Sequence, residues 1–546
     1  MQTGYGASSN LGVNHMRKTW NPLKAAFVAA LIALGSATAA QADMVLHRGN
    51  GTEPETIDPA KSTGVTENAI ENDLFEGLVT FSPDGEQVPG AAESWEISDD
   101  GTVYTFHLRQ DGKWSNGDPV TANDFVYSFR RTVDPATASD YAPILSPIVN
   151  ASAIIAGENT DLTSLGVTAV DDYTLQIMLN APTPYLFGLL THNVAFPVHQ
   201  ATIEQFGEEW TRPGNMVSNG AFVLADWVPQ SQLTVVKNPN FHAADEVKLD
   251  KIVFYPTEDL AEELKRYRAG ELDITYDVPS DQVAWLEENM ADEFHNTPYL
   301  GTYYYVINLT KEPLGNDLKI RQALALAIDR EILTEKITQA GELPAYSWVP
   351  PDIEGYEQRF TFYKDMTQEE RTAMAMELIA EAGYGPDNPL PIELLYNTSD
   401  NHKKIAVAIA SMWKKIGVET TLTNQEWKVY LESRDQKNYQ IARAAWIGDY
   451  ADPLNFLELF LSDAGERNDA GYNNPEFDRL LTEAAATVDP AARLKLLEQA
   501  EQIFLDDVAL IPIYHYTSQH MISPQVVGWE FNILDVHLGR YMSLAE

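Results

Sequence analysis

Short apolar runs punctuate residues 301–515 at regular intervals. They are rich in β-branched and aromatic residues, and their length of six to eight residues is typical of strands rather than helices. The clearest are YYYVINL (303–309), IELLYN (392–397), VETTLTN (418–424) and QIARAAWI (440–447). We therefore expect a sheet in this half of the chain.

Longer segments lie between these runs, and their apolar residues recur every three or four positions, which predicts amphipathic helices. Thr367 and Glu370 form a capping box for a helix that ends at Gly383, and Gly417 closes another. The remaining predicted helices cover 319–337 and 426–434. The alternation of strand and helix predicts an α/β lobe over residues 301–515.

Residues 251–278 predict a βαβ unit in the first half of the chain. KIVFYP (251–256) is apolar, EDLAEELKRYRAG (258–270) has helical periodicity, and LDITYDV (272–278) alternates. Such a unit implies two parallel strands joined by a crossover helix. We expect a first lobe made of residues 43–75, 200–300 and 516–546.

The segment 76–199 has a different pattern, with short alternating runs and many turn residues. VYTFHLRQDGKWSNGDP (103–119) predicts a strand, an Asp-Gly turn and a strand edge, and Thr121 with Asp124 begins a helix. We expect a β-rich domain inserted in the first lobe. A chain of 546 residues is too long for a single compact core, which agrees with several domains.

The beginning of the chain predicts export. Arg17, Lys18 and Lys24 precede the apolar run 25–34, and Ala40-Gln41-Ala42 has the small-x-small pattern of a signal-peptidase site. Residues 1–42 are therefore predicted to be a cleavable signal peptide, with a more natural start at Met16. The apolar run is much shorter than the roughly 20 residues of a membrane span.

Charge and cysteine content narrow the class of protein. Residues 43–546 hold 34 Lys and Arg against 80 Asp and Glu, a formal charge of −46, which repels nucleic acid and anionic lipid. The sequence has no cysteine, so a lipid-anchored cysteine, a disulfide and a thiol catalyst are excluded. We expect a soluble monomer in the periplasm of a bacterium with an outer membrane.

The segment RAAWIGDYADP (443–453) places opposite charges at the end of a predicted strand. Asp449 lies just beyond the carboxyl end of that strand, the edge at which open α/β sheets bind ligands. Arg443 lies inside the strand, where an unpaired charge is costly. The two residues either bind a ligand or satisfy each other or a nearby helix end, and spacing alone does not decide between these roles.

Motifs of enzymes are absent from the sequence, which contains no His-Glu-x-x-His, no Gly-x-Ser-x-Gly and no phosphate-binding glycine loop. His515 and His520 are better interpreted as core or surface residues than as metal ligands. Among the aromatic residues, Tyr304 or its neighbours Tyr303 and Tyr305 can face a cleft, but not all three, because strand side chains alternate.

Several long blocks resemble one protein family. They are IDPAKSTGVTEN, DLFEGLVT, AAESWEISDDGTVYTFHLRQDGKWSNGDPVTANDFVYSFRR, PGNMVSNGAFVLADW, LLYNTSDNHKKIA, NQEWKVYLESR and ARAAWIGDYADP. Essentially end to end, the chain is similar to the periplasmic oligopeptide-binding proteins of ABC importers, in extracellular solute-binding protein family 5. The resemblance implies a two-lobed α/β fold, closing like a flytrap on an extended peptide, with an additional β-rich domain in the N-terminal lobe.

The resemblance also implies roles for particular residues. Asp449 would pair with the α-ammonium group of the peptide, Arg434 and His402 would meet the C-terminal carboxylate of peptides of different lengths, and Arg443 would belong to the same charged floor of the site. Other matching positions flank the peptide backbone or its side-chain pockets: Val65, Tyr141, Tyr276, Tyr299, Tyr304, Trp427 and Trp446. The implied partners are a peptide and the permease and ATPase subunits of an importer. No cofactor, metal or catalytic residue is implied.

The sequence departs from the family pattern at a few positions. Thr63 replaces a glutamate that faces a ligand side chain, and Asp277 stands where asparagine is common, so a preference for basic side chains is in doubt. Gly301 and Ile447 replace a cysteine pair. Two other functions stay open at this point: a carrier of murein tripeptides from the same branch, and a secreted hydrolase, for which no nucleophile or metal cluster is visible.

Overall fold

The computed structural model describes residues 43–545, apart from the side chains of Asp400, Trp427, Lys428 and Glu466. The predicted signal peptide, residues 1–42, lies outside the described residues. Within them, no helix combines the length and the apolar character that a membrane crossing requires.

The first lobe contains a four-stranded sheet in the order β1-β10-β9-β8. Its strands are β1 (Val45–Gly49), β10 (Lys251–Tyr255), β9 (Gln232–Lys237) and β8 (Phe222–Val228). β1 and β10 are parallel, and the other pairs are antiparallel. Helix α2 (Val65–Leu74) buries Ile70 and Leu74 in the same core as this sheet.

The expected strand 272–278 does not form, although helix α7 (Leu260–Arg268) precedes it as predicted. Ile274 makes isolated bridges, parallel to Arg48 and antiparallel to Ile522. The amide of Tyr276 then donates to the Glu263 carboxylate at 2.9 Å instead of to a neighbouring strand. The backbone groups of this segment therefore pair with β1, with Ile522 and with the side chain of Glu263, and no continuous strand forms. Of the predicted βαβ unit, the first strand and the helix are present, and the second strand is reduced to the parallel bridge at Ile274.

The inserted segment forms an antiparallel sheet in the order β4-β5-β7-β6 and a small β2-β3 hairpin. The strands are β2 (Val79–Phe81), β3 (Gln87–Pro89), β4 (Ala92–Ile97), β5 (Val103–Leu108), β6 (Val167–Asp171) and β7 (Thr174–Met178). The Thr121–Asp124 capping box begins helix α3 (Ala122–Val133), as predicted. The expected strand edge after the Asp-Gly turn is only a bridge between Lys113 and Pro119.

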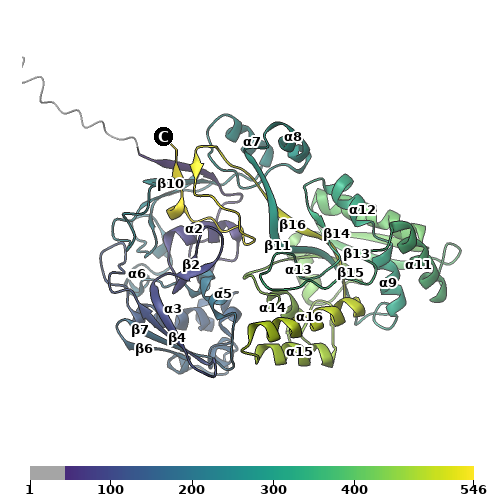
Figure 1. Ribbon diagram of the computed structural model, residues 1–546, viewed down its shortest axis with the longest axis horizontal. Coiled ribbons are helices and arrows are strands. Elements are labelled where there is room, and N and C mark those ends of the chain that lie inside the picture. Colours follow the sequence, from purple (N-terminus) through teal and green to yellow (C-terminus); the bar gives the residue numbers. More distant parts are fainter. Residues whose placement is uncertain (1–42, 546) are drawn as a thin grey trace, which may run out of the picture. The chain divides into compact units, whose positions relative to one another are not determined.

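The third sheet has six strands in the order β12-β16-β11-β15-β13-β14. They are β11 (Phe294–Ile307), β12 (Leu343–Pro344), β13 (Leu390–Asn397), β14 (Val418–Gln425), β15 (Ile441–Ile447) and β16 (Leu510–Met521). One core contains residues of this sheet and of α9 (Leu318–Leu326), α11 (Gln368–Glu381) and α12 (Asp400–Lys415), which lie together in Figure 1. The other contains residues of α14 (Leu454–Leu457), α15 (Pro475–Ala485) and α16 (Pro490–Asp507).

Strands β11 and β16 pair from Phe294 with Met521 to Val306 with Leu510, with an irregularity between Pro298 and Thr302. The expected lobe boundaries, 300/301 and 515/516, fall within these two strands. Such an interruption is a suitable place for a hinge, because a few residues there can absorb a change of backbone angles. The predicted extents of the three domains stay a prediction.

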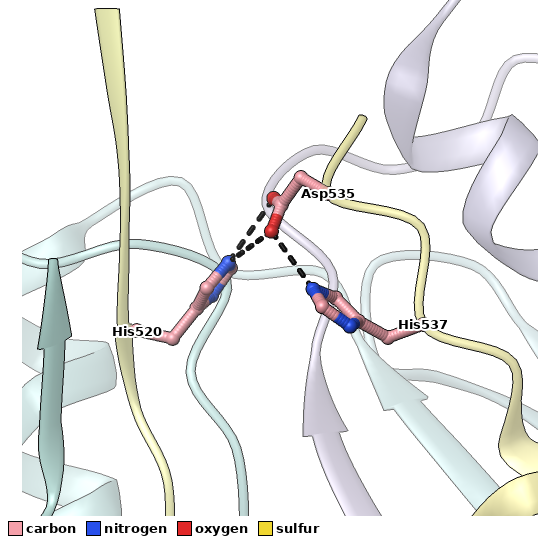
Figure 2. Close-up of side chains that lie close together, drawn as sticks. All are labelled: His520, Asp535 and His537. Atoms are coloured by element: carbon pink, nitrogen blue, oxygen red, sulfur yellow. Dashed lines mark hydrogen bonds and ion pairs between the residues drawn. The ribbon is translucent and has the colours of Figure 1, made fainter. Parts of the chain in front are cut away.

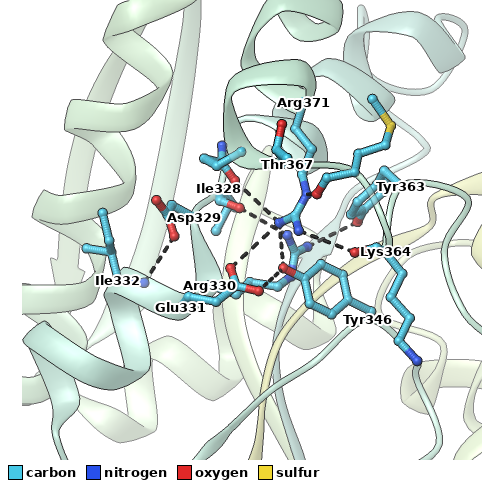
Figure 3. A network of polar contacts seen from close by, with 12 residues as sticks. Ile328, Asp329, Arg330, Glu331, Ile332, Tyr346, Tyr363, Lys364, Thr367 and Arg371 are labelled. Carbon is cyan, nitrogen blue, oxygen red and sulfur yellow. Dashed lines mark hydrogen bonds and ion pairs between the residues drawn. The ribbon is translucent and has the colours of Figure 1, made fainter.

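The single helix predicted for 319–337 is wrong. The chain forms α9 (Leu318–Leu326), a turn α10 (Arg330–Ile332) and a π-helical segment, Leu333–Thr338. Arg330 is fully buried, and its guanidinium donates to the carbonyls of Ala325 and Ile328 at 3.3 and 3.1 Å, while Asp329 accepts from the amide of Ile332 (Figure 3). The helix ends here because the Arg330 side chain donates to carbonyl groups that a continuing helix would pair with backbone amides.

Candidate ligand-binding cleft

Residues from both the first and the third sheets line one cavity. Its wall includes the end of β1 and the first turns of α2, and Asp449 follows the end of β15 on the opposite wall. Five residues expected to bind a ligand line it: Val65, Tyr141, Tyr276, Tyr299 and Asp449. Thr63, one of the departures from the family pattern, lines it as well.

Asp449 is placed by a close approach of the chain at the end of β15. The amide of Gly448 donates to the Leu300 carbonyl at 2.7 Å, and a Cβ on Gly448 would lie 2.6 Å from Leu300 Cδ2, so a larger residue here would have to displace the Leu300 side chain. Asn455 accepts from the Asp449 amide at 3.0 Å and donates to its carboxylate at 3.4 Å. The side chain of Trp446 donates to the same Asn455 oxygen, so Trp446 supports Asp449 without lining the cavity.

The carboxyl group of Asp449 is held in an unfavourable environment for its charge. Burial raises its pKa to about 6, and the hydrogen bond from Asn455 only partly opposes this shift. No Lys, Arg or His side chain forms an ion pair with it within the described part of the chain. The alternative that Asp449 and Arg443 pair with each other is therefore not the arrangement that the structure has.

Arg443 does not line this cavity and lies in a cluster of aromatic side chains. Its guanidinium lies 4.7 Å from the centre of the Tyr303 ring and donates to Tyr516 Oη at 3.3 Å and to Asn397 Oδ1 at 3.4 Å. Its Nε has no hydrogen-bond partner, and none of the ion pairs among the described residues includes Arg443. Among the described residues, Arg443 is thus a second buried charge without an ion-pair partner.

His402 belongs to the same cluster, since its Nδ1 lies 3.3 Å from Tyr303 Oη. Burial, together with the nearby Arg443, lowers the pKa of His402 to about 3, so the imidazole is neutral. Arg434 is instead ion-paired with Asp469 and lies over the ring of Tyr430. The side chain of Trp427 lies outside the described residues.

Tyr304 does not line the cavity. It is 2% exposed and packs edge-on against Trp348, with ring centres 4.6 Å apart, while Tyr303 and Tyr305 face the other core. The alternation of strand side chains thus separates the three tyrosines as expected, but it places Tyr304 in the interior.

The remaining departures from the family pattern lie close to the site. Gly301 is opposite Ile447 in the register of β11 and β15, as residues that replace a cysteine pair would be. Burial raises the pKa of Asp277 to about 6.

His515, in β16 of the third sheet, is a core residue, as expected. Its imidazole lies between Thr302 Oγ1 and Ser347 Oγ.

Sequence reasoning missed a polar cluster on the cavity wall, formed by His520, Asp535 and His537 (Figure 2). The sequence alone favours a core or surface role for His520 and singles out neither Asp535 nor His537. The Asp-x-His spacing of 535 and 537 was the available signal, but only the fold brings His520, 15 residues earlier, to the same carboxylate.

Comparisons with known proteins agree on one family. A model of the bacterial extracellular solute-binding proteins, family 5 Middle, matches residues 86–468. The periplasmic oligopeptide-binding protein OppA of Escherichia coli (strain K12) is 44% identical over 488 residues, which cover 89% of each chain.

Solved structures match over almost the whole chain. The Escherichia coli murein tripeptide binding protein MppA has a TM-score of 0.82 at 42% identity, covering 93% of this chain and 99% of that one. Haemophilus influenzae OppA, in complex with RPPGFSPFR, has a TM-score of 0.80 at 39% identity, covering 93% and 100%. These matches confirm the predicted fold class, a two-lobed α/β binding fold with an additional β-rich domain in the N-terminal lobe.

Proposed function

The chain belongs to the bacterial extracellular solute-binding proteins of family 5, and we propose that it captures oligopeptides in extended form between its lobes and delivers them to an ABC importer. In this proposal it is a binding protein and not an enzyme. It acts as a monomer in the periplasm after removal of residues 1–42, and its partners are the permease and ATPase subunits of the importer.

The observation that carries the proposal is that neither the partly buried Asp449 nor the buried Arg443 has an ion-pair partner among the described residues. A free peptide has an ammonium group at one end and a carboxylate at the other, and a water-excluding site must offer the opposite charge to each. We assign the ammonium group to Asp449 and the carboxylate to Arg443, with His402 as a neutral neighbour.

The spacing of these charges agrees with a short peptide. Asp449 follows Arg443 by six positions, and β15 ends at Ile447, so their Cα atoms are at most about 20 Å apart along the chain. An extended tri- to pentapeptide spans roughly 10–17 Å, and the two side chains cover the remainder. Val65, Tyr141, Tyr276 and Tyr299 then flank the ligand, and backbone hydrogen bonding makes binding independent of its sequence.

Two assignments from the family resemblance have less support. Arg434 is available to a longer peptide only if it exchanges its partner Asp469, and Trp446 acts on Asp449 through Asn455. We retain both, with Trp427, as residues around the peptide site, whereas Tyr304 is a residue of the core that supports it.

Native mass spectrometry of residues 43–546, purified without refolding, tests this function. We expect several bound masses that sequence, after acid release, as mixed tri- to pentapeptides. One discrete mass containing diaminopimelate would reassign the protein to murein tripeptides. Absence of bound peptide, even after addition of a tripeptide mixture, would contradict the proposal.

Peptide affinity should fall as the pH decreases through about 6. The carboxyl pKa of Asp449 is about 6 in the free protein, and a bound ammonium group lowers it, so protonation favours the peptide-free form. Between pH 7 and pH 5 the dissociation constant of trialanine should rise roughly tenfold, since each pH unit below the free pKa costs up to tenfold.

Calorimetric titrations at several pH values, in buffers of different ionisation enthalpy, measure both this slope and the proton uptake. The Asp449→Asn variant is the matched control, because its residual affinity should not depend on pH in this range. An equal slope in both proteins would assign the titration to another group.

A further inference from the structure

The cluster of His520, Asp535 and His537 has the geometry of a metal site. Asp535 Oδ1 lies 3.0 Å from His520 Nε2 and 2.9 Å from His537 Nε2, and one ligand atom of each residue lies within 4.8 Å of the others. Nitrogen and oxygen ligands around a tetrahedral Zn²⁺ are about 3.3 Å apart, from metal–ligand distances of about 2.0–2.1 Å. Small side-chain movements would therefore complete the site.

The backbone already holds the ligand atoms in place. Asp535 has a φ of 56°, in the left-handed region that few residues other than Gly, Asn and Asp adopt, and this conformation presents its carboxylate to both imidazoles (Figure 2). The ring of His537 is stacked on Trp529, with centres 3.4 Å apart. All three side chains are at most partly exposed, and they line the same cavity as Asp449.

The hydrogen bond on the other side of the His520 ring indicates which nitrogen is free. His520 Nδ1 lies 2.9 Å from the Thr275 carbonyl, which can only accept, so Nδ1 carries a proton. Nε2 is then the nitrogen for a metal ion: in the metal-free protein it donates its proton to the Asp535 carboxylate at 3.0 Å, with Ser518 Oγ 2.8 Å away, and the ion would replace that proton. Metal-binding histidines commonly have this arrangement, with the second ring nitrogen donating to a backbone carbonyl.

The surrounding charges favour a cation at this point. Asp277 interacts electrostatically with both His520 and Asp535, and Glu263 interacts with His520. Arg48 opposes a cation, because its guanidinium donates to the His537 carbonyl at 3.0 Å, but Asp73 lies near enough to compensate that charge. Burial raises the pKa of Glu263 and of Asp73 to about 7 and that of Asp277 to about 6, so these groups are only partly ionised at neutral pH, and a bound cation would favour their charged forms.

We propose that His520, Asp535 and His537 bind one divalent late transition metal ion of the Zn²⁺, Ni²⁺ or Cu²⁺ class, with an open coordination position facing the ligand cavity. Imidazole ligands select these ions over Mg²⁺ and Ca²⁺, which prefer oxygen. Two histidines and one carboxylate leave room for a water molecule or for a donor group of a ligand in the cavity. This site does not depend on peptide binding and is tested with the metal alone.

Calorimetric titration of the peptide-free protein with ZnCl₂, after treatment with a chelator, is the first experiment. We expect one Zn²⁺ per chain, no comparable binding of Mg²⁺, and a higher melting temperature with Zn²⁺. His537→Gln and Asp535→Asn preserve size and hydrogen bonding, and each should weaken Zn²⁺ binding at least about 100-fold, more than the loss of an outer-shell partner. His107→Gln, which removes a histidine with a side chain 40% exposed in β5, is the matched control and should leave affinity unchanged.

A second measurement keeps the result independent of any loss of stability. Co²⁺ should give the visible absorption bands of a four- or five-coordinate site in the wild-type protein and in His107→Gln, but not in folded His537→Gln, with circular dichroism as the check of folding. If the wild-type protein binds no stoichiometric Zn²⁺, or if His537→Gln and Asp535→Asn bind it as tightly as the wild type, the three residues form only a hydrogen-bonded cluster and the proposal is overturned.

Discussion

Replacing Asp449 by asparagine should greatly weaken peptide binding with the fold intact. Removing one member of a buried, hydrogen-bonded charge pair costs about 2–5 kcal/mol of binding free energy, much of it because the other charge is left unpaired. We expect trialanine to bind the variant at least about 100-fold more weakly than the wild type. Isothermal titration calorimetry at pH 7 measures the difference, and retained affinity would remove the ammonium assignment.

The same substitution should stabilise the peptide-free protein. The pKa of Asp449 is raised from 3.8 to about 6, so the folded state binds more protons than the unfolded state between these values. Stability is therefore lost as the pH rises through this interval, and at pH 7 the buried carboxylate costs on the order of 3 kcal/mol. An asparagine removes this cost, and urea unfolding of the peptide-free variant should show a higher midpoint.

N-acetylated trialanine is the matched control for the loss of peptide binding. It has no ammonium group, so it should bind the wild type and Asp449→Asn with the same low affinity. If the acetylated and free peptides bind the wild type equally, the natural ligand has no free amine, whatever the result with the variant. The four combinations form a cycle that isolates the interaction between the carboxylate and the amine.

Sequence patterns predicted those parts of the fold that depend on neighbouring residues. The capping boxes at Thr121 and Thr367 begin helices at the expected positions, because each is complete within four residues. The segment 319–337 has helical periodicity throughout, yet Arg330 interrupts it by contacts that include Pro512 in β16, which no local pattern contains. The strand predicted for 272–278 is wrong because of similar distant contacts: the backbone partners of this segment include Met521 and the side chain of Glu263.

Contacts between residues distant in the sequence also limit what can be predicted of the candidate site. Asp449 could be predicted because strand ends in α/β sheets bind ligands, and its position depends on one strand. The pairing of Arg434 with Asp469, 35 residues away, removes an arginine that sequence reasoning had treated as free for the ligand. The cluster around Asp535 depends on the path of the C-terminal segment, which has few regular elements and thus little periodicity to interpret.

The contacts of Arg330 give the largest expected change in stability. This side chain has no exposed surface. It donates to the Pro512 carbonyl of β16 at 2.8 Å and to Tyr363 Oη at 3.1 Å, in addition to the carbonyls of Ala325 and Ile328. The rings of Tyr346 and Tyr363 cover its guanidinium, with centres 5.0 and 5.3 Å away (Figure 3).

Arg330→Met should lower the free energy of unfolding by about 3–5 kcal/mol, because it retains the apolar stem but leaves several buried carbonyl groups without donors. Urea unfolding of the peptide-free protein measures this loss. Arg330→Lys should have an intermediate effect, since one ammonium group cannot reach all the carbonyls that the planar guanidinium contacts. Lys364→Met, a nearby lysine over the Phe360 ring, is the control and should change stability by less than about 1 kcal/mol. If Arg330→Met unfolds at the same urea concentration as the control, hydrogen bonds from Arg330 are not what stabilises the break between α9 and α10.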